Sequence, residues 1–234
     1  MARLPRLAIA DHVHLLLQRG RSGQAVFVTA DDAHSYLRAL HAAAEQTGVA
    51  VHAYALSAAE AVMLVTPASA NSLARMIQSL GRRFAGEYNR RHGSSGSPWD
   101  GRFRSTVIDP AEHLLDCLCF VEGPANAADR PFSSAAHHIG QRHDPLITAH
   151  AGYWRLGNTP FEREAAHREL LSRGLPPETE SKIRDALVKG WALGDTSFVA
   201  ALSGYTQRRA RPLTRGRPPA PQDRTTMSPI KITR

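Results

Sequence analysis

The His-hydrophobic-His pattern at His12-Val13-His14 is the first arrangement in the chain whose side chains could bind a metal ion. Residues i and i+2 of a β-strand point to the same face, so two such histidines can chelate one ion. The apolar run at residues 7–17 predicts a strand that would give the pair this geometry. A strand whose histidines have no metal-binding role is the competing interpretation.

The cysteines and the later histidines of the chain are less well placed to bind a metal ion or to act in catalysis. Cys117 and Cys119 share one apolar segment, and two thiols alone do not complete a zinc site, so we interpret them as reduced core cysteines. The segment that contains His137, His138 and His143 has a loop-like composition, which predicts solvated histidines rather than ligands.

Arginines form the second chemically suggestive group, because a guanidinium presents a fixed fork of donors that suits phosphate oxygens. Arg75, Arg82 and Arg90 have the spacing of one face of a long helix, and segment 82–104 is rich in arginine. A solvated helix face is the alternative. The residues that we predict to bind DNA within the body of the chain are Arg19, Arg75, Arg82, Arg83, Arg90, Arg91, Arg102 and Arg104.

The charge of the chain is concentrated near its end. The formal net charge is +8, and the segment from residue 207 onward holds eight basic residues against one acidic residue. A nearly neutral body with a basic tail favours a polyanionic partner, although a solvated tail gives the same composition. Within the tail, Arg215-Gly216-Arg217-Pro218 is similar to the core of an AT-hook, which lays arginines in a narrow minor groove.

The elements that must position these residues follow a β-α-β-β-α-β-α order. Thr29 and Asp32 have capping-box spacing, Gly48 ends the helix that follows them, and Asp109-Pro110 starts a later helix. This order predicts an α+β fold, a ferredoxin-like split βαβ sheet with helices on one face. A small helical C-terminal region follows, with helical patterns near 161–173, 178–190 and 195–203.

We predict three parts of the chain: a ferredoxin-like domain at 1–128, a helical extension at 129–206 and a basic, disordered tail at 207–234. No apolar run has the length of a membrane span, and no signal peptide is predicted. We therefore expect no membrane partner and a cytoplasmic, nucleoid-associated location.

Short pieces along residues 3–219 occur in the order in which a known family carries them. These pieces are Arg3-Leu4-Pro5-Arg6, Gln18-Arg19-Gly20, Val51-His52-Ala53-Tyr54, Tyr88-Asn89-Arg90-Arg91-His92, Trp99-Asp100-Gly101-Arg102-Phe103, Pro131-Phe132-Ser133-Ser134, Asp144-Pro145-Leu146, Gly157-Asn158-Thr159-Pro160-Phe161, Gly194-Asp195 and Arg215-Gly216-Arg217-Pro218. The ordered set resembles the REP-associated tyrosine transposases, single-strand DNA transposases of the His-hydrophobic-His class. The resemblance implies a ferredoxin-like nuclease fold that binds single-stranded DNA hairpins and cuts them with a tyrosine and a divalent metal ion.

The positions that carry this chemistry in the family hold other residues here. The family's histidine pair falls on Glu60 and Val62, and valine cannot ligate a metal. The family's nucleophilic tyrosine falls on Phe120, which lacks the hydroxyl needed for a phosphotyrosine. The turn at Gly123-Pro124-Ala125-Asn126-Ala127-Ala128-Asp129 is also shorter than the family's. The tyrosines at Tyr54, Tyr88 and Tyr153 are interpreted as packing residues rather than replacement nucleophiles.

The His12-Val13-His14 strand matches the family's first strand, where histidines are common and are not the catalytic pair. We therefore expect a catalytically inactive protein that binds hairpin or single-stranded DNA as a monomer or homodimer, without a cofactor. The alternatives are an active metal-dependent nuclease with a site rebuilt from His12, His14 and Glu60, which would use Mg²⁺ or Mn²⁺, and a decayed relic or RNA binder.

Overall fold

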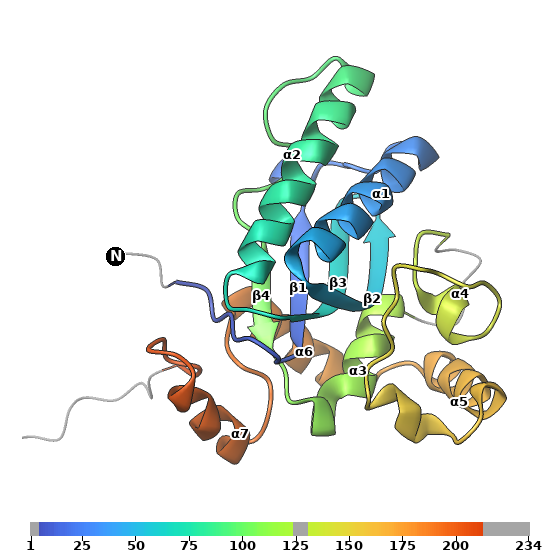
Figure 1. Cartoon of the computed structure of the whole chain (residues 1–234), viewed down its shortest axis with the longest axis vertical. Helices are drawn as coiled ribbons and strands as arrows, with labels where there is room; N and C mark the ends of the chain where they lie inside the picture. Colours follow the sequence, from blue (N-terminus) through green and yellow to red (C-terminus); the bar gives the residue numbers. More distant parts are fainter. Residues whose placement is uncertain (1–4, 124–130, 213–234) are drawn as a thin grey trace, which may run out of the picture.

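The computed structural model describes residues 5–123 and 131–212 and contains one four-stranded sheet (Figure 1). Its strands are β1 (His14–Arg19), β2 (Val49–Ser57), β3 (Glu60–Pro67) and β4 (Arg104–Val107). The strand order is β2-β3-β1-β4, and every neighbouring pair is antiparallel. This is the predicted split βαβ sheet.

Two long helices make the crossovers that this strand order requires. Helix α1 (Ala30–Thr47) connects β1 to β2, and α2 (Ser72–His92) connects β3 to β4. The predicted capping box forms at the start of α1, where the Thr29 and Asp32 side chains each accept from the other's backbone N–H. Gly48 ends α1 in the left-handed conformation, with φ 64°.

Helices cover both faces of the sheet, which differs from the predicted placement on one face. Helices α1 and α2 lie on one face as expected, and α3 (Pro110–Glu122) lies on the other. The reason is visible in β1, because Leu16 joins the core under α1 and α2 while Leu15 and Leu17 join the core under α3. A strand that is apolar on both sides must be covered on both sides.

The C-terminal helices complete the second core instead of forming a separate body. The remaining helices are α4 (Ala135–His138), α5 (Pro160–Arg173), α6 (Pro177–Lys189) and α7 (Thr196–Ala201), with 3-10 turns η1 (Arg21–Gly23), η3 (Tyr153–Leu156) and η4 (Leu202–Gly204). Ile183 and Leu187 of α6 pack in the same cluster as Leu15 and Leu17. The predicted helical extension therefore shares a hydrophobic core with the predicted ferredoxin-like domain.

The ends of two predicted segments also differ from the structure. The first strand begins at His14 rather than near residue 7, because Asp11 turns the chain with φ 58° and donates its N–H to Pro67 O. The predicted tail begins at 207, yet Ala210 is buried and its carbonyl accepts from Ala192 N–H at 2.9 Å. Residues 207–212 therefore belong to the folded body.

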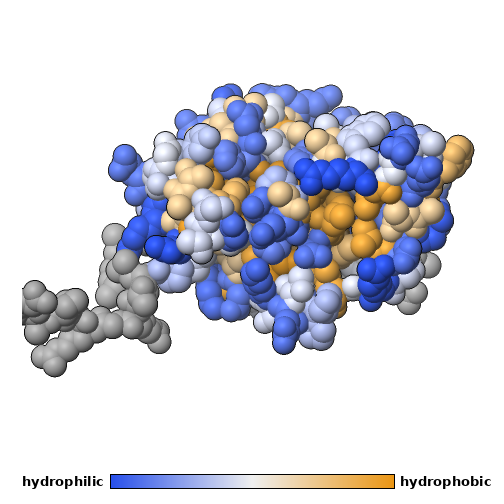
Figure 2. Space-filling view, turned by 90° about the horizontal axis from the view of Figure 1, so that it is seen from below, coloured by the Kyte–Doolittle hydropathy of each residue, from blue (hydrophilic) through white to orange (hydrophobic). Residues whose placement is uncertain are grey.

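The surface seen from below in Figure 2 gathers hydrophobic residues in its centre, inside a border of hydrophilic side chains. In the described part of the chain, no helix combines the length and the apolar character needed to cross a membrane.

Candidate nucleic-acid interface

A groove of about 770 Å³ lies between α2 and the loop that precedes β4. Four arginines, Arg6, Arg75, Arg82 and Arg102, line it, and none of its described lining residues is acidic. Arg75, Arg82 and Arg102 are exposed and form no ion pair with any described residue. Their positive charges are therefore not neutralised by carboxylates of the fold.

The sequence of α2 explains why two of these arginines share the groove. Leu73, Leu80 and Phe84 are buried against the sheet and fix the rotation of the helix. Arg75 and Arg82 are seven residues apart, which is close to two helical turns, so they lie along one edge of α2. That edge faces the loop that carries Arg102.

A second hollow, of about 250 Å³, continues this groove toward β4 and the end of α6. It shares Arg6, Arg102 and Phe103 with the first hollow. It adds three further basic residues, Arg104, Lys189 and Arg208. We call the two connected hollows the basic groove. Its lining is Pro5, Arg6, Gln18, Asn71, Ala74, Arg75, Ile77, Gln78, Gly81, Arg82, Ser97, Trp99, Gly101, Arg102, Phe103, Arg104, Ser105, Leu187, Val188, Lys189, Gly190 and Arg208.

Several side chains of the basic groove are held in place by the fold. The Arg6 guanidinium lies 3.8 Å from the centre of the Phe103 ring. Arg104 donates to Val188 O at 2.8 Å, and Arg208 donates to Gly190 O at 2.7 Å. Burial lowers the pKa of Arg208, and its Nε has no partner among the described residues. An anion in the groove would offset the desolvation of that guanidinium.

The structure separates the predicted DNA-binding arginines into two groups. Arg75, Arg82, Arg102 and Arg104 meet in the basic groove. The others lie elsewhere: Arg83 donates to Gln46 at 3.4 Å, Arg91 pairs with Asp32 at 2.5 Å, Arg19 pairs with Glu60 at 2.6 Å, and Arg90 is exposed outside the groove. Arg215 and Arg217 lie outside the described residues.

Sequence reasoning missed three basic residues of the groove, Arg6, Lys189 and Arg208. Arg6 belongs to a piece that carried the family resemblance, and Arg208 was counted only as part of the basic tail. No periodic pattern joins these positions to α2, because the three residues come from the N-terminal segment, α6 and the C-terminal segment.

The positions that the sequence resemblance aligns with the family's catalytic residues lie on the face of the sheet that α3 covers. Val62 and Phe120 are half-buried and pack against the same cluster, the one beneath α3. Glu60 precedes Val62 by two residues on β3, so it projects from the same face. Its carboxylate accepts from Arg19 Nε at 2.7 Å, and the Arg184 guanidinium lies 5.3 Å from the Phe120 ring centre. The shortened turn at residues 123–129 lies, beyond Gly123, outside the described residues.

The first histidine pair does not form a chelating arrangement. Both ring nitrogens of buried His14 are engaged, since Nε2 accepts from Ile9 N–H at 3.2 Å and Nδ1 bonds the His12 carbonyl at 2.7 Å. Burial lowers the pKa of His14 to about 4, so the ring is neutral at pH 7. His12 precedes β1, and its Nδ1 bonds Ala10 O at 2.8 Å.

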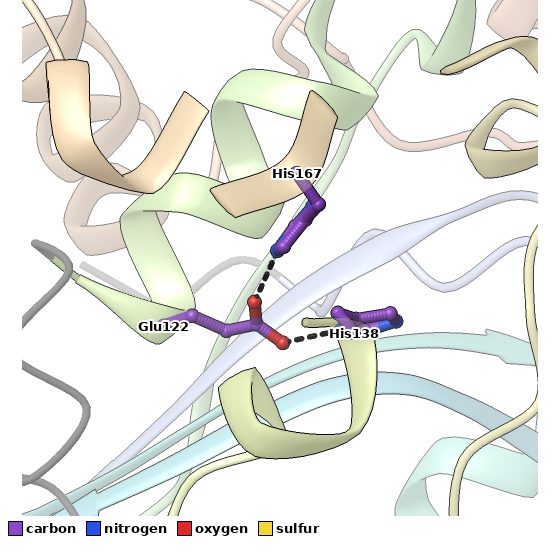
Figure 3. Close-up of side chains that lie close together, drawn as sticks. All are labelled: Glu122, His138 and His167. Atoms are coloured by element: carbon purple, nitrogen blue, oxygen red, sulfur yellow. Dashed lines mark hydrogen bonds and ion pairs between the residues drawn. The ribbon is translucent and has the colours of Figure 1, made fainter. Parts of the chain in front are cut away.

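A different histidine pair meets a carboxylate beneath α3 (Figure 3). Glu122 accepts from His138 Nδ1 at 2.6 Å and from His167 Nε2 at 2.6 Å, and all three side chains are buried. Desolvation works to raise the pKa of Glu122, but the charge and hydrogen bond of His138, together with His167, outweigh it and lower the pKa to about 2. The prediction that His138 is solvated is therefore wrong, whereas His143 is exposed as expected.

The remaining singled-out residues have structural roles. The Tyr54 hydroxyl donates to Asp144 at 2.6 Å, and the Tyr153 hydroxyl donates to His138 O at 2.9 Å. Cys117 and Cys119 are buried and free, as predicted. Neither cysteine belongs to a described cluster that could hold a metal ion.

Comparison with known proteins gives a fold likeness alone. No family model matches the chain, and no curated protein matches it. A solved REP-associated tyrosine transposase bound to a REP hairpin aligns with a TM-score of 0.50 and 13% identity, over 65% of this chain and 93% of that one. A putative transposase from Deinococcus radiodurans aligns with a TM-score of 0.37 and 16% identity, over 48% and 89%. The chain therefore has the fold of a REP-associated tyrosine transposase.

Proposed function

We propose that this protein binds hairpin or single-stranded DNA in its basic groove and leaves the DNA uncut. The observation that carries the proposal is the basic groove itself, a continuous hollow with seven basic side chains and no acidic residue in its described lining. A nucleic-acid backbone is the polyanion that such a lining suits, because each neutralised phosphate releases counterions.

The fold likeness supports a DNA hairpin as the ligand. The solved transposase of the same fold is bound to a REP hairpin. The basic groove includes a hollow of about 770 Å³ beside Arg75 and Arg82, and the Arg6 guanidinium is oriented on the Phe103 ring. A guanidinium that is already oriented loses less conformational entropy when it binds a phosphate.

The absence of cleavage rests on the side chains at three positions. Val62 offers no ligand atom, and Phe120 offers no hydroxyl nucleophile. Glu60 is the one potential ligand of the three, and its carboxylate already accepts a hydrogen bond from Arg19 Nε at 2.7 Å and forms an ion pair with Arg19 Nη2 at 2.6 Å. A metal-assisted transesterification needs metal ligands and a hydroxyl nucleophile, and these three positions supply neither a ligand pair nor a hydroxyl.

Binding is tested with a labelled hairpin oligonucleotide in a fluorescence anisotropy titration over a range of salt concentrations. The variant Arg75→Gln/Arg82→Gln removes two charges from the basic groove, and Arg38→Gln/Arg173→Gln removes two exposed charges outside it. We expect the groove variant to weaken binding by about 10-fold or more and to reduce the log–log salt slope by roughly 1.4 to 1.8. Equal losses in both variants would contradict binding in the groove.

Cleavage is tested separately by incubating the same hairpin with the protein and Mg²⁺ or Mn²⁺, followed by denaturing electrophoresis. We expect intact DNA with the natural sequence and with Phe120→Tyr, because the tyrosine alone restores no metal ligand. A covalent protein–DNA adduct formed by the natural sequence would overturn the proposal that it leaves DNA uncut, without bearing on binding.

A further inference from the structure

We propose that Glu122, His138 and His167 bind one Zn²⁺ ion, which holds α4 and α5 against the C-terminal end of α3. The three residues come from these three helices and point toward one another in Figure 3. They are the one group of metal-ligating side chains in residues 5–123 and 131–212 whose ligand atoms converge. The site lies apart from the basic groove and shares none of its lining residues.

The donor set has the composition that zinc prefers. Two imidazole nitrogens and a carboxylate are common zinc ligands, with metal–ligand distances of about 2.0 to 2.2 Å. The ligand atoms of Glu122, His138 and His167 all lie within 4.8 Å of one another. Donors around one tetrahedral zinc are about 3.3 Å apart, so binding requires side-chain shifts on the order of 1 Å.

The charge of the cluster also favours a divalent cation. The Glu122 carboxylate is fully buried, and its described contacts are two imidazoles and the Ser134 hydroxyl at 2.5 Å. No arginine or lysine among the described residues pairs with it. An ionised carboxylate in a dry interior costs several kcal/mol unless a cation balances it. Zinc would supply that charge while both histidines stay neutral.

The burial of the cluster indicates a structural ion rather than a catalytic one. His138 and His167 side chains are 2% and 0% exposed, so no substrate reaches the ion. The Ser134 hydroxyl, which already contacts the Glu122 carboxylate, is the described group placed to complete the ligand set. The other ring nitrogen of His167, Nδ1, is buried and has no hydrogen-bond partner among the described residues. This observation does not distinguish a metal-bound cluster from a metal-free one.

The position of the site explains what the ion would contribute. Helix α4 has four residues, and its core with α5 is a small cluster of Cys119, Ala135, Ile139 and Leu171. His138 and His167 are 16 and 45 residues from Glu122 along the chain. An ion that joins such distant residues restricts the unfolded chain and stabilises a region with little hydrophobic burial of its own.

The proposal is tested on the full chain after its metal content has been removed with a chelator. Zinc is added in an isothermal titration, and cobalt is added in a parallel titration that follows the visible absorption of a tetrahedral cobalt site. The variants are His167→Gln and His138→Gln, and the matched control is His41→Gln, which changes a histidine on the exposed side of α1.

We expect one zinc ion per natural chain, a cobalt spectrum of tetrahedral type and a rise in melting temperature of about 5 to 10 °C at zinc concentrations a hundredfold above the Kd. His41→Gln should behave in the same way, and the two cluster variants should lose the stoichiometric zinc and the cobalt spectrum. Circular dichroism shows whether each variant is folded, and the natural chain supplies a test that needs no variant.

A natural chain that binds no stoichiometric zinc overturns the proposal and leaves Glu122 in a network of hydrogen bonds only. Equal zinc binding by His167→Gln and His41→Gln overturns it too, because the ion would then lie elsewhere. All of these measurements are made without DNA, so their failure is distinguishable from a failure of DNA binding.

Discussion

The Arg19 guanidinium lies 2.6 Å from the Glu60 carboxylate, and the two residues are directly paired across strands β1 and β3. The sequence resemblance aligns Glu60 with a metal-binding histidine of the transposase family, and Arg19, the last residue of β1, is one of the arginines predicted to contact DNA. The ion pair therefore engages both the carboxylate that could bind a metal ion and the guanidinium that could bind a phosphate. The ion pair accounts for both residues without a ligand.

Arg19→Gln is accordingly expected to change hairpin affinity less than about 2-fold, because its charge is already balanced by Glu60. Glu60→Gln should increase affinity slightly by freeing that charge. Anisotropy titrations at one salt concentration measure both effects. A 10-fold loss of affinity in Arg19→Gln would place Arg19 in the DNA interface and contradict its assignment outside the basic groove.

Asp32 ties the start of α1 to the end of α2 through Arg91 and His92. Burial works to raise the pKa of its carboxyl, but hydrogen bonds, of which that from His92 is the largest, outweigh burial and lower the pKa to about 2. Because the pKa of Asp32 is lower in the folded chain, its ionised carboxylate stabilises the fold. This contribution to the free energy of unfolding is full above about pH 4 and is lost as the pH falls through about 2. We expect the Asp32 carboxylate to contribute about 2 kcal/mol to the free energy of unfolding.

The test compares urea unfolding of Asp32→Asn and Asp31→Asn, whose positions are adjacent and respectively buried and exposed. Asp32→Asn should lose about 3 kcal/mol at pH 7 and most of the pH dependence between pH 4 and 2. If both variants lose the same small amount, Asp32 does not act as a buried partner of α2.

His14 gives a second pH dependence at higher pH. Burial lowers its pKa to about 4, and folding therefore excludes a proton that the unfolded chain binds below about pH 6.5. The stability from this group is present above pH 6.5 and is lost as the pH falls toward 4, by about 3 kcal/mol in total. Unfolding free energies of His14→Gln should fall less steeply over this window than those of the exposed control His143→Gln. Parallel slopes would contradict a neutral, buried His14.

The docked segment at 207–212 is expected to stabilise the body. Deletion of 207–234 removes buried Ala210 and the bond from Arg208 to Gly190, whereas deletion of 213–234 keeps both. The longer deletion should melt about 2 to 8 °C below the shorter one, corresponding to roughly 1 to 2 kcal/mol. Differential scanning calorimetry measures the difference, and identical melting temperatures would show that the segment contributes nothing to folding.

Much of the fold follows from local signals in the sequence. The capping box at Thr29, the start at Asp109-Pro110 and the amphipathic stripe of α2 predict helices that the structure contains. Local signals fail where tertiary contacts decide the outcome. The apolar residues Leu7 and Ile9 suggested a strand, but they pack beside Leu202 after a turn at Asp11, a contact that no short window of sequence reveals.

The candidate site was predictable only in part for the same reason. Helical spacing correctly groups Arg75 with Arg82, but it cannot show that Arg83 faces Gln46 or that Arg91 faces Asp32 across the α1–α2 packing. Glu122, His138 and His167 are too far apart in the chain for spacing to link them, and only the packing of α3, α4 and α5 brings them together.

The edge strands of the sheet bear on how copies of this chain can meet. Strand β2 is bridged by Ser133 and Ile147, and the residue after β4, Ile108, is bridged by Leu193. These short backbone pairings occupy hydrogen-bonding groups that an edge would otherwise offer to a second chain. A foreign strand that pairs with the sheet at these positions must first displace the bridges, all of which come from segments that follow α3 in the chain.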